Sequence, residues 1–304
     1  LKPLHDHTLY LPFATSLRMS DLGYSTTAQS SLDICFNKLE TYIGSLEKAI
    51  TTPYPPYEKI GIKVDGVYRQ LNDAILQIEN EYYSDIRPKR VIQSAERHLQ
   101  ALRRRGVEYV EVRHTDVNPF LPVGMDSQQA RFIDIFLVSC LLMDSEKICP
   151  AECKTVSENM QRVITRGRQP GLSLTTAHGE VGLAEAGREL LDTLYLTAEV
   201  MDQVHERDSY RASVQAQVEK INTPALTPSA QVLEVLQETE LNYTDWIVLK
   251  SREHRKIFQH MSSDSPLQNK LAQRATRSLE EQKRLEADDS VGFDQFLKDY
   301  LEKE

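Results

Sequence analysis

The sequence predicts an α+β fold, with an antiparallel sheet region in residues 1–125 followed by a mostly helical region in residues 126–304. Three observations lead to this prediction. The stretch "GVEYVEVRH" (residues 106–114) alternates Val and Tyr with charged residues, which is typical of a half-buried strand. Asp65-Gly66 lies between alternating residues and is a strong hairpin signal. In the second region apolar residues recur at helical spacing, and no regular alternation of strands with helices indicates a parallel sheet.

The elements of the first region follow in chain order. A helix is predicted over residues 30–50, because its apolar residues recur at spacings of four and three and form one stripe. The prolines of "TTPYPPY" end this helix, and the hairpin comes next. Residues 75–83 ("ILQIENEYY") are then predicted as a strand on which Glu79, Glu81 and Tyr83 share one face.

The second region is predicted to be mostly helical. Residues 127–143 are apolar nearly all round, which predicts a buried helix. Another helix is predicted over residues 183–204, followed by a proline-containing break at residues 222–231. From Leu267 onward, a thin apolar stripe on a charged segment predicts a solvated helix that packs along one edge.

Composition excludes several classes of protein. A net charge of −9 over 304 residues argues against general binding to nucleic acids or to anionic membranes. The longest apolar run, residues 132–143, contains Asp134 and is too short to span a bilayer. The four cysteines include no CxxC pair. We therefore expect structural thiols in a reducing cytoplasm, with Cys35 and Cys140 in the core.

The sequence lacks GxxxxGK[ST] and GxGxxG, which argues against phosphate binding by a glycine-rich loop, and it also lacks the GxSxG motif of serine nucleophiles. A bound phosphate would therefore be held by side chains and metal ions. The run "RPKRVIQSAERHLQALRRR" (residues 87–105) has seven Lys or Arg against the single acid Glu96. It is either a solvated loop and helix face or a local positive wall for an anion such as a nucleotide.

The strand at residues 106–114 places Glu111 and Arg113 on one face, about 6 to 7 Å apart along the strand. An exposed ion pair of this kind is common and stabilises by about 0 to 1 kcal/mol. The alternative interpretation assigns Glu111 to a metal ion and Arg113 to a phosphate. Mg²⁺ prefers carboxylate and phosphate oxygens, and an Arg can stabilise a transferring phosphoryl group. The spacing alone leaves both interpretations open.

The chain resembles proteobacterial-type glutamate–cysteine ligases in the stretches "YLPFATSLRMSDLGY", "QIENEYYSDIRPKR" and "GVEYVEVRHTDVNPF". The similarity continues through "DSQQARFIDIF" and "VITRGRQPGLSL" into the helical tail. This resemblance implies a ligase that uses ATP to phosphorylate the γ-carboxylate of L-glutamate, after which the amine of L-cysteine attacks, the first step of glutathione biosynthesis. It also implies Mg²⁺ or Mn²⁺, and an antiparallel sheet curved into a funnel, similar to the glutamine synthetase catalytic domain, of which this chain would hold a part.

The resemblance implies roles for individual residues. Glu111 matches a metal ligand of the family, and Arg113 matches the arginine that contacts the γ-phosphate of ATP. Tyr24 and Tyr83 match the tyrosines that recognise cysteine. Arg18 matches an arginine at the amino-acid substrates.

The chain departs from the family pattern because it begins well inside that pattern. The earlier part of the pattern includes a Glu-x-Glu strand with further metal ligands, and this sequence contains no replacement for it. We therefore expect the missing N-terminal segment to be a partner and expect this chain alone to be inactive. Two interpretations remain: an ATP-dependent ligase or the C-terminal part of one, and, as the alternative, a non-catalytic fragment that binds a nucleotide or a partner.

Overall fold

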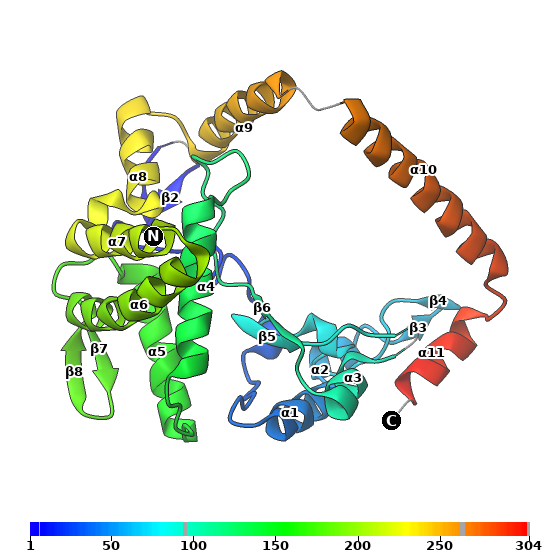
Figure 1. The fold of residues 1–304 in the computed structure, drawn as a ribbon. Coiled ribbons are helices and arrows are strands. Elements are labelled where there is room, and N and C mark those ends of the chain that lie inside the picture. The colour runs from blue at the N-terminus through cyan, green and yellow to red at the C-terminus, as the bar shows by residue number, and fades with distance from the viewer. Residues whose placement is uncertain (6, 94–95, 262–264, 303–304) are drawn as a thin grey trace. The chain divides into compact units, whose positions relative to one another are not determined.

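The computed structural model describes residues 1–5, 7–93, 96–261 and 265–302. The described part combines helices with short antiparallel strand pairs, which confirms the predicted α+β class (Figure 1). The chain forms two compact units, each built from two stretches of sequence. The first unit consists of Leu1–Ser25 and His114–Ile257, and the second consists of Thr26–Arg113 and Phe258–Glu304.

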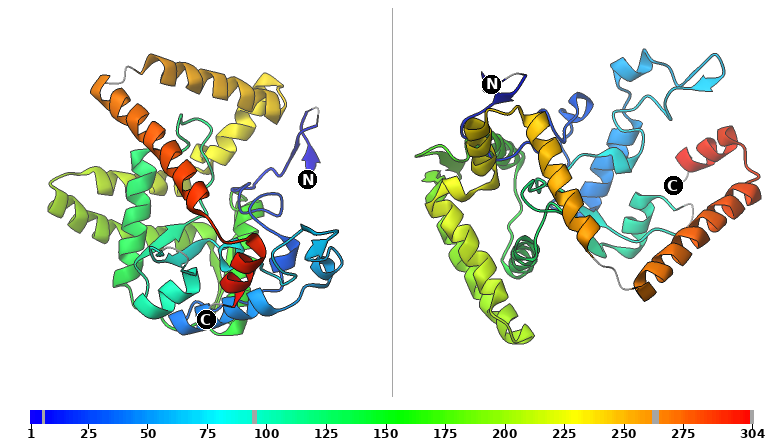
Figure 2. Two further views of the ribbon diagram at one scale, coloured as in Figure 1. Left: turned by 90° about the vertical axis from the view of Figure 1, so that its right-hand side faces the viewer. Right: turned by 90° about the horizontal axis from the view of Figure 1, so that it is seen from above.

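The core of the first unit lies between three helices. They are α4 (Ser127–Leu142), α6 (Leu183–His205) and α7 (Ser209–Asn222). These helices pack against one another, and α6 and α7 lie side by side (Figures 1 and 2). Each helix directs apolar side chains inward, where their burial stabilises the unit. The buried residues at the centre are Ile135, Leu191, Leu194, Ala198 and Val214.

The remaining elements of the first unit are mostly helical. They are β1 (Lys2–Pro3), β2 (Leu9–Tyr10), α5 (Pro150–Arg166), β7 (Ser173–Thr176), β8 (Gly179–Gly182), η3 (Pro224–Leu226), α8 (Pro228–Thr239) and most of α9 (Tyr243–His260). The sequence pattern does not predict the β7–β8 hairpin. Asn159 of α5 holds its first strand through two hydrogen bonds with the backbone of Thr175, at 2.8 and 3.0 Å. The Asn159 side-chain amide thus makes the two backbone hydrogen bonds that a neighbouring strand would otherwise make with Thr175.

The second unit is organised around α1 (Leu39–Thr51) and α3 (His98–Arg105). Its other elements are η1 (Thr27–Gln29), α2 (Pro55–Glu58), β3 (Lys63–Val64), β4 (Val67–Tyr68), η2 (Glu79–Glu81), β5 (Ile86–Lys89), β6 (Tyr109–Val112), α10 (Ser265–Asp288) and α11 (Phe293–Leu301). The apolar faces of α1 and α3 meet in one buried cluster. It consists of Tyr42, Ile43, Leu46, Ala49, Leu76, Leu99 and Leu102.

Several predicted elements are confirmed. Asp65 and Gly66 adopt positive φ angles of 52° and 79° in the β3–β4 hairpin, as a two-residue type I′ turn requires. The strand predicted within residues 106–114 is β6, which pairs antiparallel with β5. The helices predicted over residues 127–143 and 183–204 are α4 and α6.

Two predictions of secondary structure are wrong. The helix predicted over residues 30–50 is α1, which begins later. Its start is set by a capping box in which the Thr41 hydroxyl accepts a hydrogen bond from the Lys38 backbone N–H at 3.2 Å. The segment 75–83 contains the 3₁₀ turn η2 in place of a strand. Glu79 of this turn belongs to a buried ion pair, which outweighs the weak local preference for a strand.

Several side chains of α4 and α10 are more exposed than the apolar pattern of the sequence predicts. Helix α4 is not buried all round, since Leu141 and Leu142 at its end are 83% and 73% exposed. On α10, Leu271 and Leu279 are 55% and 60% exposed, so these two positions of the predicted stripe do not pack. Cys140, expected in the core, is exposed. Throughout the described part of the chain, every helix is too short or too polar to traverse a lipid bilayer.

The described strands form four sheets, each of two antiparallel strands. The wider funnel implied by the family resemblance is therefore not completed within the described residues. The two compact units also cut across the zones 1–125 and 126–304, which describe where strands and helices are dense along the sequence. The compact units thus do not coincide with the strand-rich and helix-rich parts of the sequence.

Candidate functional site

The β5–β6 ribbon of the second unit brings Glu111 and Arg113 together with two cations of the neighbouring strand. Glu111 Oε1 accepts a hydrogen bond from Arg113 Nη2 at 2.8 Å. The other carboxylate oxygen of Glu111 lies 3.7 Å from Lys89 Nζ. Arg87 is the direct cross-strand partner of Glu111 and is buried. We call these four residues the Glu111 cluster, in which three cationic side chains accompany one carboxylate.

The charges of the Glu111 cluster shift one another's pKa. Burial raises the pKa of Glu111, but the hydrogen bond and the charge of Arg113, followed by the charge of Lys89, outweigh burial and hold that pKa below its ordinary value. Burial lowers the pKa of Lys89, an effect that Glu111 opposes and the two arginines reinforce. With Glu111 ionised, the cluster keeps an excess of positive charge. Such an excess in a partly buried setting attracts anionic groups such as phosphate.

A metal ion needs more oxygen ligands than the Glu111 cluster offers. Mg²⁺ is octahedral and is held by carboxylates together with substrate phosphates and water. Across the ranges that the structure describes, no three His, Cys, Asp or Glu side chains are grouped so that they could hold a metal ion. Glu111 supplies the cluster's one carboxylate, and both of its oxygens face cations. The residues of this cluster do not make a metal site by themselves.

The basic run at residues 87–105 does not form a continuous positive wall, because most of its cations are paired within the second unit. Pairs with glutamates are Arg90–Glu108 at 3.8 Å, Arg97–Glu79 at 3.0 Å, Arg103–Glu47 at 2.6 Å, and Arg105–Glu96. Arg87 donates from Nη1 to the carbonyl oxygen of Asn80 at 2.9 Å. Ser94 and Ala95 of the run lie outside the described residues. The run is therefore mainly structural, and its candidate for binding an anion is the part that belongs to the Glu111 cluster.

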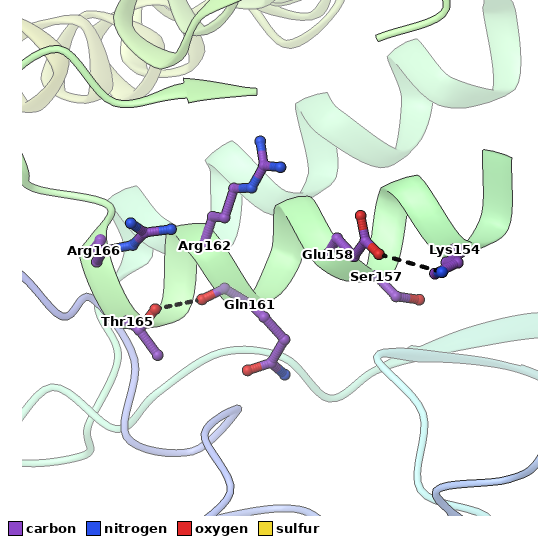
Figure 3. A pocket seen from close by; sticks show the side chains of 7 residues that line it. All are labelled: Lys154, Ser157, Glu158, Gln161, Arg162, Thr165 and Arg166. Carbon is purple, nitrogen blue, oxygen red and sulfur yellow. Dashed lines mark hydrogen bonds and ion pairs between the residues drawn. The ribbon is translucent and has the colours of Figure 1, made fainter. Parts of the chain in front are cut away.

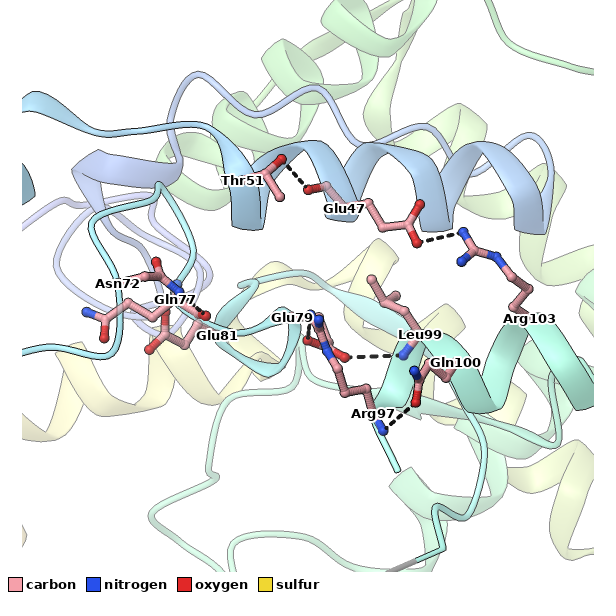
Figure 4. A network of polar contacts seen from close by, with 10 residues as sticks. All are labelled: Glu47, Thr51, Asn72, Gln77, Glu79, Glu81, Arg97, Leu99, Gln100 and Arg103. Atoms are coloured by element: carbon pink, nitrogen blue, oxygen red, sulfur yellow. Dashed lines mark hydrogen bonds and ion pairs between the residues drawn. The ribbon is translucent and has the colours of Figure 1, made fainter. Parts of the chain in front are cut away.

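Glu79 belongs to a buried polar network (Figure 4). The residue is 2% exposed. Its carboxylate accepts hydrogen bonds from Arg97 Nη2 at 3.0 Å and from the Leu99 backbone N–H at 3.3 Å. Burial raises the pKa of Glu79, but the hydrogen bond and charge of Arg97 help to bring it below its ordinary value. Because Leu99 lies in the first turn of α3, Glu79 ties η2 to the start of that helix and has a structural role.

Tyr83 follows η2 and is held through its backbone by Gln29. Gln29 Nε2 donates to the Glu81 carbonyl at 2.8 Å, and Gln29 Oε1 accepts from the Tyr83 N–H at 2.8 Å. The Glu81 carboxylate accepts from the Gln77 N–H at 2.7 Å. The predicted strand face of Glu79, Glu81 and Tyr83 is therefore wrong. Tyr83 as a whole residue is 41% exposed.

The loop at residues 16–24 of the first unit, which we call the Arg18 loop, places two predicted substrate-binding residues next to each other. The Arg18 guanidinium lies over the ring of Tyr24, 4.8 Å from its centroid, in a cation–π contact. The Tyr24 N–H donates to the Arg18 carbonyl at 2.5 Å. Gly23 permits this close approach, since a Cβ atom there would lie 2.2 Å from the Arg18 carbonyl oxygen.

Asp116 supports the Arg18 loop, and the sequence pattern alone does not single it out. Its Oδ1 accepts hydrogen bonds from the backbone N–H groups of Leu17 at 2.9 Å and Arg18 at 2.8 Å. Its Oδ2 accepts a hydrogen bond from the Ser16 hydroxyl. Asp116 lies in "GVEYVEVRHTDVNPF", a few residues after Arg113, so its place in a candidate stretch is the one sequence signal that points to it.

A shallow depression on α5 is lined by one face of that helix (Figure 3). The lining residues are Lys154, Ser157, Glu158, Gln161, Arg162, Thr165 and Arg166. Lys154 lies 3.8 Å from Glu158. Arg162 donates to Thr175 Oγ1 at 2.9 Å and lies 3.8 Å from Glu180, so it braces the β7–β8 hairpin. The residues predicted for the site do not line this depression, and we assign it no ligand.

The predicted site residues fall into two groups, one in each unit. Glu111, Arg113 and Tyr83 belong to the second unit, and Arg18 and Tyr24 belong to the first. The structure brings Glu111 into contact with Arg113, and Arg18 into contact with Tyr24. Which ligands these residues bind stays a prediction.

Comparison with known sequences identifies a family. The family model described as glutamate-cysteine ligase matches residues 1–163 of the chain. Relatives named glutamate–cysteine ligase from Pseudomonas paraeruginosa and Pseudomonas aeruginosa are each 47% identical to it over 300 residues. In each case the match covers 99% of this chain and 57% of the relative. The chain thus spans little more than half the length of these relatives.

Two solved structures have a similar fold. A glutamate–cysteine ligase from Francisella tularensis in complex with AMP matches with a TM-score of 0.86 and 36% sequence identity, covering 95% of this chain and 57% of that one. A bifunctional glutathione synthetase from Pasteurella multocida matches with a TM-score of 0.59 and 20% identity, covering 81% of this chain and 27% of that one. The second similarity concerns the fold alone.

Proposed function

Because this chain belongs to the glutamate–cysteine ligase family, we propose that a protein of full family length containing it joins the γ-carboxylate of L-glutamate to the amine of L-cysteine with ATP. The observation that carries the proposal is the 47% identity, over 99% of the chain, to relatives with that name. Below, "the full-length protein" means residues 1–304 joined to the segment that the relatives have and this chain lacks, natural or taken from a Pseudomonas relative.

In the proposed reaction, the γ-phosphoryl group of ATP moves to the γ-carboxylate of glutamate and forms an acyl phosphate. The cysteine amine attacks the acyl carbon, an amide bond forms with loss of a proton from the amine to solvent, and phosphate leaves with one former carboxylate oxygen. Arg113 and Lys89 lie together at the Glu111 cluster, where their charges would stabilise the phosphoryl group during its transfer. The Francisella relative was solved in complex with AMP, which supports a nucleotide as a ligand of the full-length protein.

The divalent ion, Mg²⁺ or Mn²⁺, belongs to the proposal through the family resemblance. This chain would supply one ligand, Glu111. The described residues do not complete a metal site, and we propose that the remaining ligands lie in the part of the relatives that this chain does not cover. We derive no step of the reaction through the ion.

Tyr24 and Tyr83 are proposed to recognise cysteine, and Arg18 is proposed to contact the amino-acid substrates. The contact between Arg18 and Tyr24 supports a shared role for these two residues. The 41% exposure of Tyr83 supports a role in binding a ligand. Nucleic acids and membranes are not proposed as partners, and the cytoplasm stays the predicted location.

In the full-length protein, Tyr24→Phe and Tyr83→Phe are expected to raise the KM for cysteine by about 5- to 150-fold, because each removes one hydroxyl that is proposed to bond to cysteine, and the loss of such a bond typically costs about 1 to 3 kcal/mol. The KM for ATP should change by less than about 3-fold, which is the size of effect expected of a near-neutral substitution. Steady-state kinetics with each substrate varied measures both. Tyr195→Phe on α6, where Tyr195 is 38% exposed, is the matched control. An effect confined to ATP would show that the assignment to cysteine is wrong.

The proposed function is tested by incubating the full-length protein with ATP, glutamate and cysteine. We expect γ-glutamylcysteine to form, identified by mass, together with ADP in equal amount. Residues 1–304 alone are expected to form none, because the described part of the chain does not complete a metal site. Nucleotide binding by the full-length protein without cysteine-dependent release of ADP would contradict the ligase and favour the alternative, a non-catalytic protein that binds a nucleotide.

A further inference from the structure

Asp116 gathers three hydrogen bonds from the Arg18 loop, although it lies about a hundred positions away in the sequence. Its Oδ1 accepts two consecutive backbone N–H groups, from Leu17 at 2.9 Å and Arg18 at 2.8 Å. Its Oδ2 accepts from the Ser16 hydroxyl, which in turn accepts from the Met19 N–H at 3.1 Å. Hydrogen bonds to an ionised acceptor are roughly twice as strong as neutral ones, so this carboxylate is the dominant polar anchor of the loop.

The segment that carries Asp116 is itself anchored. His254 Nε2 of α9 lies 2.9 Å from the Pro119 carbonyl oxygen. The ring of Phe120 meets the ring of Trp246 edge to face, at 5.6 Å between centroids, and Trp246 is 3% exposed. Asp116 therefore projects from a segment that is fixed to a helix by a polar and an aromatic contact.

The other side of the Arg18 loop is anchored independently. Thr15, immediately before the loop, donates from its backbone to the Ile164 carbonyl at 2.9 Å and from its hydroxyl to the Val163 carbonyl at 2.7 Å. These bonds attach the residue before the Arg18 loop to the end of α5. They do not fix the direction of the Arg18 N–H, which is set by Asp116.

We infer that Asp116 is a positioning residue, which holds the Arg18 backbone so that Arg18 and Tyr24 present one preorganised surface to the amino-acid substrates. This inference rests on the proposed function for the roles of Arg18 and Tyr24. The geometry supports it because the amide of Arg18 binds Asp116 while the carbonyl of Arg18 binds the Tyr24 N–H at 2.5 Å. Both polar groups of the Arg18 backbone are thus fixed, and its guanidinium lies over the Tyr24 ring.

The kinetic test compares Asp116→Ala with Asp116→Asn in the full-length protein. Removing the carboxylate is expected to raise the KM for glutamate and for cysteine about 10- to 100-fold, since several hydrogen bonds to one charged acceptor are lost. The KM for ATP should stay within a factor of about 3, within the range of near-neutral changes. Asn keeps an oxygen for the Leu17 and Arg18 amides and an NH₂ that can donate to Ser16, but it lacks the charge, so Asp116→Asn should raise the KM for glutamate and for cysteine clearly less than Asp116→Ala does.

The control variant is Asp126→Ala. Asp126 caps α4 by accepting the Gln129 backbone N–H at 2.7 Å, so Asp126→Ala loses the same kind of contact in the same unit, but the contact belongs to α4 and not to the Arg18 loop. It should leave every KM unchanged. Equal increases in the KM for ATP and for the amino acids in Asp116→Ala, or full activity in that variant, would overturn the inference.

A structural readout separates this inference from the proposed function. Amide hydrogen exchange at Leu17 and Arg18 is expected to become at least about 10-fold faster in Asp116→Ala and to accelerate less in Asp116→Asn, because exchange reports the loss of local hydrogen bonds. Unchanged exchange in Asp116→Ala would overturn the inference even if the ligase activity is found. If wild-type protein lacks ligase activity, the proposed function fails while the exchange result still decides whether Asp116 holds the loop.

Should Asp116→Ala fail to fold, Ser16→Ala replaces it. This change removes the hydroxyl that bridges Asp116 and the Met19 N–H and leaves the carboxylate in place. We expect about a 3- to 10-fold rise in the KM for the amino acids, the effect of one or two ordinary hydrogen bonds. An unchanged KM in Ser16→Ala, together with unchanged amide exchange at Met19, would contradict the inference.

Discussion

Replacing Glu111 by Gln in the full-length protein is expected to lower kcat by about 100-fold or more, the usual effect of removing one preorganised charged or polar group at a phosphoryl- or acyl-transfer site. Gln keeps the shape of the side chain but removes the negative charge. That charge orients Arg113 through the 2.8 Å hydrogen bond and offsets the charge of Lys89. Initial rates of ADP release, measured across a titration of Mg²⁺, give kcat for the variant and the wild type.

The matched control is Glu108→Gln on the preceding part of the same segment. Glu108 lies 3.8 Å from Arg90 and its side chain is 48% exposed, so the two residues form an ordinary exposed ion pair. Its loss should change kcat by less than about 3-fold, as expected for a surface pair. If Glu111→Gln keeps a kcat as close to the wild type as the control does at ordinary Mg²⁺ concentrations, Glu111 only forms a surface ion pair and has no part in the reaction.

Replacing Glu79 by Ala is expected to lower the free energy of unfolding by about 3 to 5 kcal/mol, because it leaves the buried guanidinium of Arg97 without its carboxylate. It also removes the acceptor of the Leu99 N–H at the start of α3. Urea unfolding of the full-length protein, followed by circular dichroism, measures the change. Glu40→Ala, at an exposed position on α1, is the control and should cost less than about 1 kcal/mol.

The stabilising effect of Glu79 should depend on pH. Its pKa is lowered in the folded protein, where burial opposes the shift and Arg97 contributes to it. The stabilisation is therefore fully present above the ordinary pKa of the unfolded chain, about 4.3, and is lost as pH falls through the lowered folded-state value. The difference in unfolding free energy between wild type and Glu79→Ala should shrink below about pH 4. A difference that stays constant there would show that Arg97 does not stabilise the ionised form.

The parts of the fold that the sequence predicts correctly are governed by local chemistry. Asp65 and Gly66 form their hairpin because the turn needs two residues that tolerate positive φ. Helices α4 and α6 follow from apolar spacing that repeats over several turns. The 3₁₀ turn η2 could not be predicted in this way, since it depends on a buried pair between Glu79 and Arg97, eighteen positions apart.

The candidate site is predictable to the same extent. Glu111 and Arg113 share a face because side chains alternate along a strand, so their contact follows from the sequence. Lys89 joins them through the register of β5 with β6, which local patterns do not specify. Asp116 and Gln29 act through backbone groups of distant loops, and their residue types are common in turns and on surfaces. Roles in binding ATP, glutamate and cysteine came from the family resemblance.

The central claim is that the full-length protein activates glutamate by phosphorylating its γ-carboxylate. It is tested most directly with glutamate that carries ¹⁸O in that carboxylate, supplied with ATP and cysteine. The account predicts that each turnover transfers an ¹⁸O atom from glutamate to inorganic phosphate, because phosphate leaves the acyl carbon with the carboxylate oxygen. Mass analysis of the released phosphate shows this label. Formation of γ-glutamylcysteine with unlabelled phosphate would contradict the account.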